Sequence, residues 1–394
     1  MPSDQSTWLV AAPETGDTEG LFDELTTKLS GSSKAVLPLN ISQLAIPSFK
    51  TGTLESLVTI SEGLPKQDAF FTATVAKTVD TLRNLLNNDS SKMSQHILVN
   101  EQPVDTYLFK GWSWNEGRYG VHRGVREMLE VLNKEMMSID NVMKQKLNSY
   151  NLAKGSLTQM QRKRTGNLSV RSLVDVVKAE HFISDSEYLQ TVIVAVPKNN
   201  VKDWNSKYER LTPMVVPRSS TLIASDDEYN LYAVVVFKRV HDDFVQKCRE
   251  DKFMVRDFEF SEDAMARQRE ELQQADLTEK ELWTELLQVS RTNFSEAFQI
   301  LAHLKVLELF IESVLRYGLP AHYVGFLIKP ESKMTKRTLS TLQSQFAYLG
   351  RRSGTAKGSA SGAGATEDFG GEYATLLEQE YFDFVLFEIP WIVL

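Results

Sequence analysis

The segment Gln161–Leu173, with the sequence QRKRTGNLSVRSL, concentrates the cations Arg162, Lys163, Arg164 and Arg171. Guanidinium groups bind carboxylates and phosphates through paired hydrogen bonds, so this segment could dock an acidic partner or be read as a localisation signal. The alternative is a solvated helix end, in which the cations interact with the negative end of the helix dipole and Gly166 ends the helix. Both interpretations stay open, and we take partner binding by these four residues as the working hypothesis.

Residues capable of catalysis are present but are not arranged as a site. The six histidines do not have the spacing of metal ligands, and none has a carboxylate at a spacing that would pair the two. They are His96, His122, His181, His241, His303 and His322. His303 lies on an apolar helical pattern, which predicts a packed side chain. Neither a nucleophile elbow in a structured context nor an HExxH motif occurs. We therefore expect no catalytic residue, no metal and no cofactor.

The Gly-rich stretch Gly350–Gly371 could suggest a phosphate-binding loop, but its pattern argues against one. A P-loop requires Ser or Thr after its lysine, whereas Lys357 is followed by Gly358. Small residues dominate the stretch, and no strand leads directly into it. Residues 350–371 are therefore expected to form a flexible loop.

Composition narrows the class of protein. The chain has 394 residues, of which 42% are hydrophobic and 24% charged, which is enough for two or three cores. A net charge of -8 argues against a nucleic-acid partner. Cys248 is the only cysteine, which fits a reducing cytosol, and the first residues lack the pattern of a signal peptide. No long uncharged apolar run occurs, so any membrane association is expected to be indirect.

Two long helices are predicted to position the basic segment. Val121–Met160 has apolar residues at steps of three and four, with Gly155 as its weak point. Ser261–Arg316 contains neither proline nor glycine, and Gly318 and Pro320 follow where a helix should stop. A helix of that length would reach about 80 Å at ~1.5 Å per residue. The pattern favours an elongated, helix-rich α+β protein with a two-helix coiled-coil neck.

Shorter elements fill the rest of the chain. The middle block reads as βαββαβ, which fits a split-βαβ sandwich without excluding other α+β arrangements. Its predicted strands are Tyr188–Val196, Val215–Ala224, Tyr229–Phe237 and Val255–Phe260, and its helices are Val201–Leu211 and Val240–Phe253. Outside it, strands are predicted at Trp8–Ala12, Lys34–Leu39, Tyr323–Ile328 and Tyr381–Ile389, with helices at Glu19–Leu29, from Leu54 onward, and at Ser332–Leu349.

Several long motifs resemble one family. The runs RKRTGNLSVRSLVDVVK, YLQTVIVAVPK and ESVLRYGLP are similar to the C subunit of the eukaryotic vacuolar-type proton ATPase (V-ATPase), and the likeness extends from about Ala45 to the final strand. The resemblance implies a foot from residues 1–119 and 316–394, neck helices at 120–160 and 261–315, and a head at 161–260. It also implies a non-catalytic part of the peripheral sector that controls reversible assembly of the pump.

The partners implied by the resemblance are the peripheral stalks, which are E–G heterodimers, and the N-terminal domain of the membrane sector's a subunit. Some family members also bind actin. The expected location is the cytoplasm and, when assembled, the cytosolic face of vacuolar or other acidic-organelle membranes. Two rivals remain: an enzyme with a helical arm, which would need a nucleotide site, and a stand-alone coiled-coil adaptor or actin-binding tether.

Overall fold

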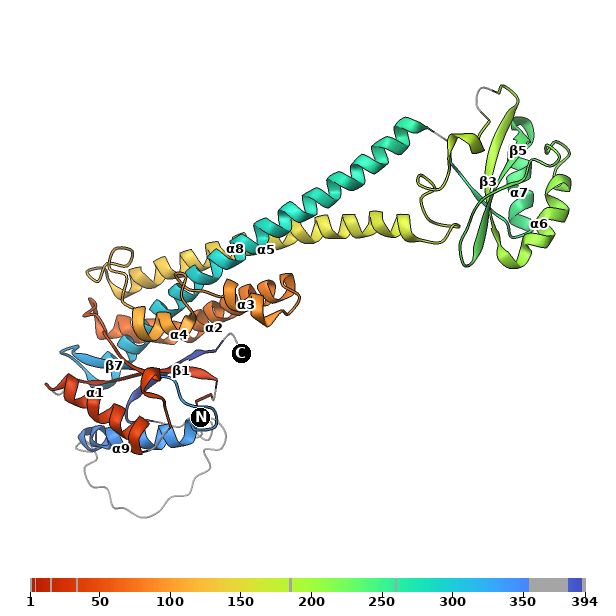
Figure 1. Ribbon diagram of the computed structural model, residues 1–394. Coiled ribbons are helices and arrows are strands. Elements are labelled where there is room, and N and C mark those ends of the chain that lie inside the picture. Colours follow the sequence, from red (N-terminus) through yellow and green to blue (C-terminus); the bar gives the residue numbers. More distant parts are fainter. Residues whose placement is uncertain are drawn as a thin grey trace, which may run out of the picture. The chain divides into compact units, whose positions relative to one another are not determined.

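The structure is a computed structural model that describes residues 2–3, 5–14, 16–32, 35–183, 186–258, 261–353 and 382–391. The chain divides into two compact units (Figure 1). The first unit combines Met1–Lys146 with Glu285–Leu394, and the second is Leu147–Thr284. Both units contain helices and a small antiparallel sheet, so the fold is helix-rich α+β.

The sheet of the first unit has the strand order β2-β7-β1-β8. Its strands are β1 (Ser6–Pro13), β2 (Ile41–Leu44), β7 (Tyr323–Ile328) and β8 (Val385–Pro390). Strand β1 is buried on both faces: Leu9 and Ala11 belong to one core, while Trp8 and Val10 belong to the other. This double burial explains why the strand reads as a nearly unbroken apolar run, although its pairings are antiparallel.

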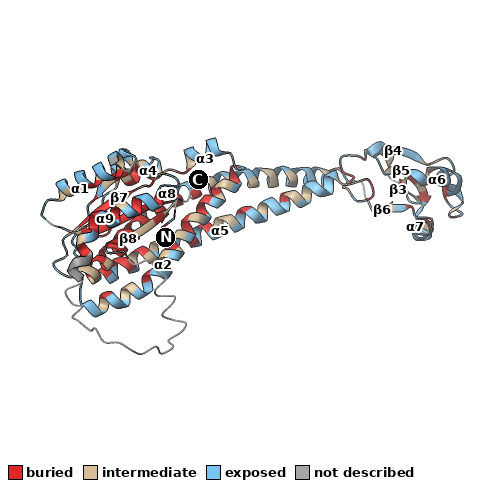
Figure 2. Ribbon diagram, turned by 90° about the horizontal axis from the view of Figure 1, so that it is seen from below, coloured by how far each residue is buried: buried red, intermediate tan, exposed pale blue. Residues whose placement is uncertain are grey.

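Helices cover both faces of this sheet (Figure 1). On one face lie α1 (Thr18–Thr26) and α9 (Thr335–Ser353), which bury Leu25, Leu342 and Phe346 against Trp8. The other face is covered by α2 (Leu54–Leu85), by the first part of α5 (Val125–Thr165) and by the apolar part of α8 (Glu262–Tyr317). Figure 2 shows the buried residues concentrated in these strands and helices.

Capping groups mark the ends of the long helices in the first unit. The Thr53 side chain accepts a hydrogen bond from the backbone N–H of Ser56 and so caps α2. Helix α8 ends at Tyr317, where Gly318 has a φ of 81° and donates its N–H to the carbonyl of Val314 over 2.9 Å. That left-handed conformation strongly favours glycine, so the predicted stop is a C-cap.

The second unit has a sheet with the order β4-β5-β3-β6. Its strands are β3 (Leu189–Pro197), β4 (Thr221–Ser225), β5 (Tyr229–Phe237) and β6 (Met254–Arg256). Helices α6 (Val201–Lys207) and α7 (His241–Glu250) cover one face, where Trp204 and Phe244 are fully buried. The other face is covered by the segment that follows α5, through Leu168, Leu173 and Val177. This packing fixes the position of the predicted basic segment.

Short helical segments complete the described chain. They are α3 (Ser90–His96), α4 (Val104–Thr106), two π-helical turns at Thr27–Ser32 and Tyr107–Gly111, and 3₁₀ turns at Pro38–Asn40, Ala179–His181, Lys198–Asn200, Tyr208–Arg210 and Lys238–Val240.

Several boundaries differ from the sequence-based expectation. The predicted strand Lys34–Leu39 is wrong: Pro38 opens a 3₁₀ turn, Leu37 and Leu39 are exposed, and the strand is β2. Strand β4 is shorter than predicted because Val215 makes only an isolated bridge to Val236. Helix α9 continues to Ser353, so residues 350–353 are helical, and 354–371 of the expected loop lie outside the described residues. The coiled-coil neck and the foot, neck and head division stay predictions.

Candidate partner-binding surface

The last turn of α5 carries Arg162, Lys163 and Arg164, and the chain then folds back over the helix end. The N–H of Gly166 donates to the Arg162 carbonyl over 3.1 Å, and the N–H of Ser172 donates to the Lys163 carbonyl over 2.6 Å. These bonds satisfy carbonyls that a helix C-terminus otherwise leaves free. The predicted helix end is therefore present, and the loop after it is fixed to the helix.

Asp226 holds the beginning of this loop against the sheet. Its carboxylate accepts hydrogen bonds from the backbone N–H groups of Leu168 (2.5 Å), Tyr229 (2.6 Å) and Glu228 (2.8 Å). Burial acts to raise the pKa of Asp226, but these N–H groups hold the pKa below its ordinary value. The loop is thus tied to the turn that precedes β5.

Arg256 of β6 holds the other side of the loop. Its guanidinium donates to the carbonyls of Ser169, Val170 and Arg171, the last over 2.7 Å. Burial lowers the pKa of Arg256, and the three carbonyls supply hydrogen bonds that water would otherwise make. The Val170 side chain remains 71% exposed at the tip. The loop backbone is therefore held in place, with the apolar side chain of Val170 exposed beside Arg171.

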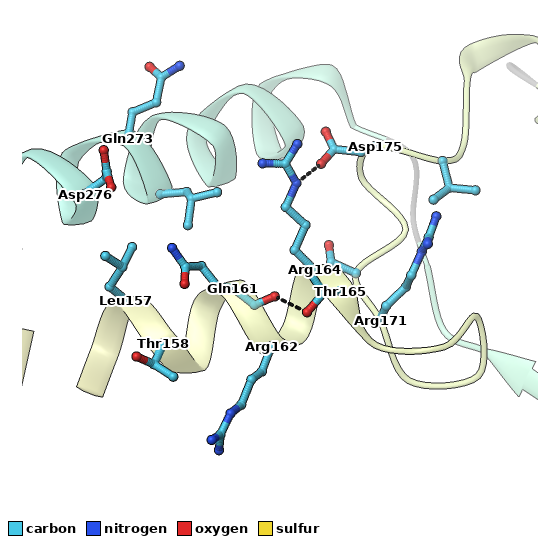
Figure 3. Close-up of a pocket in the computed structure, with 13 residues that line it drawn as sticks. Leu157, Thr158, Gln161, Arg162, Arg164, Thr165, Arg171, Asp175, Gln273 and Asp276 are labelled. Atoms are coloured by element: carbon cyan, nitrogen blue, oxygen red, sulfur yellow. Dashed lines mark hydrogen bonds and ion pairs between the residues drawn. The ribbon is translucent and has the colours of Figure 1, made fainter. Parts of the chain in front are cut away.

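A shared carboxylate joins this region to the first turns of α8. Asp175 forms an ion pair with Arg164 over 2.9 Å and a second with Arg269 over 3.2 Å (Figure 3 draws the first). Arg269 also donates to the carbonyl of Val174 over 3.5 Å. Because all three charged side chains are well exposed, each pair contributes only about 0.2–1 kcal/mol. These contacts organise the surface more than they stabilise the fold.

Two hollows flank the Arg164–Asp175 pair, with volumes of about 910 Å³ and 360 Å³. Leu157 and Val176 line the larger one, Met160 and Val174 line the smaller, and Leu272 lines both. Each hollow therefore combines apolar side chains, here called its floor, with charges of both signs. Three cations and two acids line each one, with Asp276 in the larger, Glu271 in the smaller and Asp175 in both. Mixed surfaces of this kind suit a polypeptide partner better than a small ion.

The four predicted residues do not form one surface patch. Figure 3 shows Arg164 directed toward Asp175, while Arg162 projects from the opposite side of α5. Their separation follows from helix geometry, since residues two apart point in nearly opposite directions. Arg162 and Arg171 line the larger hollow, and Lys163 lines the smaller. Within the described part of the chain Arg162, Lys163 and Arg171 form no ion pair, although the charge of Arg171 also helps to lower the pKa of Asp226. The charges of Arg162 and Lys163 are therefore the more available to a partner.

Sequence reasoning missed Asp175, Arg256 and Arg269. Asp175 lies within the motif RKRTGNLSVRSLVDVVK, but nothing in that motif marks it as a partner of the cations, and Arg269 is one of many charges on the polar first turns of α8. Their role arises from contacts across 85 to 94 residues of sequence. A single sequence carries no measure of such pairings.

His303, in the first unit, is packed as predicted. Its Nε2 accepts a hydrogen bond from the N–H of Asn115 over 3.1 Å, so Nδ1 carries the proton and donates to the carbonyl of Gln299 over 2.7 Å. The rings of Trp114 and Tyr119 lie 4.8 and 4.9 Å away. Burial lowers its pKa to about 4, so His303 is neutral near pH 7. Both ring nitrogens are satisfied by the protein, which leaves neither one for a ligand.

A buried charged group in the same unit involves Lys305 and Glu308 of α8 and Asp68 of α2. Lys305 Nζ lies 2.6 Å from Asp68 and 3.4 Å from Glu308. Burial raises the pKa of Glu308 to about 8, against the opposing effect of Lys305. Lys305 therefore has a compensating carboxylate in Asp68 even when Glu308 is protonated.

Metal-ligand clusters and membrane-spanning helices are two further features that a chain of this size could carry. The described residues contain no group of three or more His, Cys, Asp or Glu side chains placed to hold a metal ion. None of their helices combines the length and apolarity needed to cross a membrane.

Comparison with known proteins identifies the family. Residues 7–385 match the family described as the V-ATPase C subunit. The C 1-A subunit of the V-type proton ATPase of Danio rerio is 36% identical over 342 residues, covering 87% of this chain and 88% of that protein. The C 1 subunit of the V-type proton ATPase of Xenopus tropicalis is 35% identical over 382 residues, covering 97% of each chain.

A solved structure of the cytoplasmic N-terminal domain of the V-ATPase I subunit, a homologue of the a subunit, also aligns over 88% of this chain and 97% of that chain. Its identity of 12% and TM-score of 0.26 are too low to indicate a shared fold. The match over residues 7–385 and the near-complete coverage at 35% identity, by contrast, establish the family. The chain belongs to the family of V-ATPase C subunits.

Proposed function

We propose that this chain is a non-catalytic stator subunit in the peripheral sector of a V-ATPase. It bridges peripheral stalks, the E–G heterodimers, and the N-terminal domain of the a subunit, and it takes part in the reversible assembly of the pump. The observation that carries this proposal is family membership over residues 7–385. Arg162, Lys163 and Arg171 form no ion pair among the described residues and lie beside a loop fixed at both sides, so they add a surface suited to an acidic stalk.

The mechanical requirement explains why such a brace needs no active site. A rotary pump converts ATP hydrolysis into rotation, and the hydrolysing ring must be held still against the ion path in the membrane. A brace must contact separate partners and resist torque between them. Paired helices supply stiffness, and end domains supply specificity. Several modest contacts hold firmly together and are lost together, because each effectively concentrates the next.

In this proposal the head binds one stalk through the surface around Arg162–Arg171, and the foot binds a second stalk and the a subunit. The chain reaches the cytosolic face of the membrane only through these partners. It neither binds a cofactor nor hydrolyses ATP by itself. Turnover of ATP by the purified chain would contradict this part of the proposal.

Charge reversal tests the assignment of the basic residues. Replacing Arg162, Lys163 and Arg164 by Glu in the full chain should weaken binding of the purified E–G heterodimer at least about tenfold at physiological salt, because attraction becomes repulsion. The loss should shrink as salt concentration rises. Isothermal titration calorimetry at several salt concentrations measures both effects.

A matched variant controls for net charge. Lys202, Arg210 and Arg239 are exposed in the same unit and have no ion pairs within the described residues. Replacing these three by Glu changes the net charge equally and should leave stalk affinity within about twofold, since none of them lines either hollow and exposed charges are screened by salt. Equal losses in both variants, or no loss in either, would refute the assignment.

A further inference from the structure

The Asp175 carboxylate is shared by two arginines. One oxygen, Oδ2, lies 2.9 Å from Nε of Arg164, and the other, Oδ1, lies 3.2 Å from Nε of Arg269. The two guanidinium groups come from different helices, α5 and α8, and converge on this single acid. Two guanidinium groups that converge in this way can bind a carboxylate, and here the carboxylate belongs to the same chain.

The backbone around Asp175 is fixed independently of its side chain. Leu173 and Val177 are buried beneath the sheet, and the N–H groups of Val176 and Val177 both donate to the carbonyl of Leu173 over 3.0 Å. The Asp175 side chain, in contrast, is 38% exposed. It can therefore rotate away from both arginines without disturbing the fold, and ion pairs this exposed are weak enough to exchange.

The hollows on either side indicate what would replace it. Both are lined by Arg164 and Asp175, so the ion pair lies between them, and Leu272 is the apolar side chain that they share. An acidic side chain flanked by leucine-like residues, as on one face of an amphipathic helix, would use the arginines and the floor together. A compact phosphate ligand would leave the floor unused.

We propose that this groove binds an acidic amphipathic helical segment, whose carboxylate displaces Asp175 from Arg164 and Arg269. Asp175 is then an internal competitor that limits the affinity of the site. Arg162 and Arg171 line the larger hollow and Lys163 lines the smaller, and their positive charge attracts the acidic segment before it docks. The inference rests on the proposed function, which supplies the E–G heterodimer as the binding partner.

The test is a gain in affinity on removing a charge from the site. In the full chain, Asp175→Asn should bind the purified E–G heterodimer about fivefold more tightly than the wild type, because the partner no longer has to displace an ion pair. Asp175→Glu, which keeps the competing carboxylate, should stay near the wild-type affinity. The gain should disappear in an Arg164→Gln, Arg269→Gln background, because both cations that Asp175 pairs with are then absent.

A second acid provides the control for net charge. Asp251 pairs with a single cation, Lys207, over 3.5 Å in the same unit and lies outside both hollows. Asp251→Asn removes the same charge and should leave the affinity within about twofold of the wild type. Thermal unfolding of every variant identifies any that fails to fold.

Three outcomes would overturn the inference. Asp175→Asn could bind the heterodimer no more tightly than the wild type, which would make Asp175 a support for the loop. It could bind inorganic pyrophosphate more tightly while its affinity for the heterodimer stays constant, which would make the groove a small-anion site. Absence of wild-type binding to the heterodimer would overturn the proposed function and this inference together, whereas the first two outcomes leave the proposed function standing.

Discussion

The single titratable side chain of His303 makes the stability of the first unit depend on pH. Its folded-state pKa of about 4 lies below the ordinary value of 6.5, because the ring is buried among Trp114 and Tyr119. The folded protein therefore binds fewer protons than the unfolded chain between these values. The stability contributed by neutral His303 is complete above pH 6.5 and is lost as pH falls toward 4.

We expect this loss to amount to about 3 kcal/mol, at 1.36 kcal/mol per pKa unit. His303→Gln removes the titrating group, so its unfolding free energy should fall less steeply over the same range. Urea denaturation at pH 7 and pH 4.5 measures the difference. Parallel pH profiles for the two proteins would contradict this role of His303.

The contribution of Glu308 to stability changes with pH in the opposite direction to that of His303. Burial raises its folded-state pKa from 4.5 to about 8, so the folded state favours the protonated acid. Its contribution to stability is complete below pH 4.5 and is lost as pH rises toward 8. Glu308→Gln mimics the protonated form, and Asp68 remains to compensate Lys305 at 2.6 Å.

The unfolding free energy of Glu308→Gln relative to the wild type should therefore rise by about 2 kcal/mol between pH 6 and pH 8. Chemical denaturation at the two pH values measures this change. Asp68→Asn is a useful comparison, because it removes the acid that compensates Lys305. A difference between Glu308→Gln and wild type that stays constant with pH would show that Glu308 ionises without a penalty.

Among the helices, Gly155 of α5 is an avoidable weak point. A Cβ added at Gly155 would meet nothing within 4 Å, and its backbone is helical. Glycine in a helix interior costs roughly 0.5–1 kcal/mol relative to alanine. Gly155→Ala should therefore stabilise α5 by that amount and slow the hydrogen exchange of nearby amides.

Gly63 of α2 is a matched position, because a Cβ there would also meet nothing within 4 Å. Gly63→Ala should stabilise its own helix similarly. If Gly155→Ala instead weakens stalk binding while Gly63→Ala does not, then α5 needs its flexible position in order to bind.

The local sequence pattern predicts well those helices and strands whose formation depends mainly on their own residues. Strands β1, β3, β5 and β7 consist mainly of apolar residues, and Gly318 ends α8. Prediction failed at Lys34–Leu39, where apolar residues are exposed beside Pro38, and was imprecise at β4, an edge strand with a bulge. Apolar composition alone does not reveal which face is buried.

The candidate site was predictable only in part. The basic run near Arg164 is visible in the sequence, but its pairing with Asp175 and Arg269 depends on where β6, the loop after α5 and α8 meet. The different directions of Arg162 and Arg164 (Figure 3) follow from helix geometry once α5 is known to continue to Thr165, beyond its predicted end at Met160. Long-range contacts decide which cations are available to a partner.

At the scale of the whole molecule, bridging requires one chain to hold separate partners at the same time. The described residues form two compact units with their own cores, and the proposed bridging role assigns a separate binding surface to each unit. Binding through both gives an avidity that neither surface provides alone. Loss of either contact should then release the chain at working concentrations, which suits a joint that assembles reversibly.

Native mass spectrometry of the full chain mixed with purified E–G heterodimer and the N-terminal domain of the a subunit tests this requirement most directly. We predict a complex that contains one copy of this chain, two heterodimers and one N-terminal domain of the a subunit. The charge-reversed variant at Arg162, Lys163 and Arg164 should lose one heterodimer and keep the other partners. Complexes that never contain more than one partner per chain would contradict the bridging role.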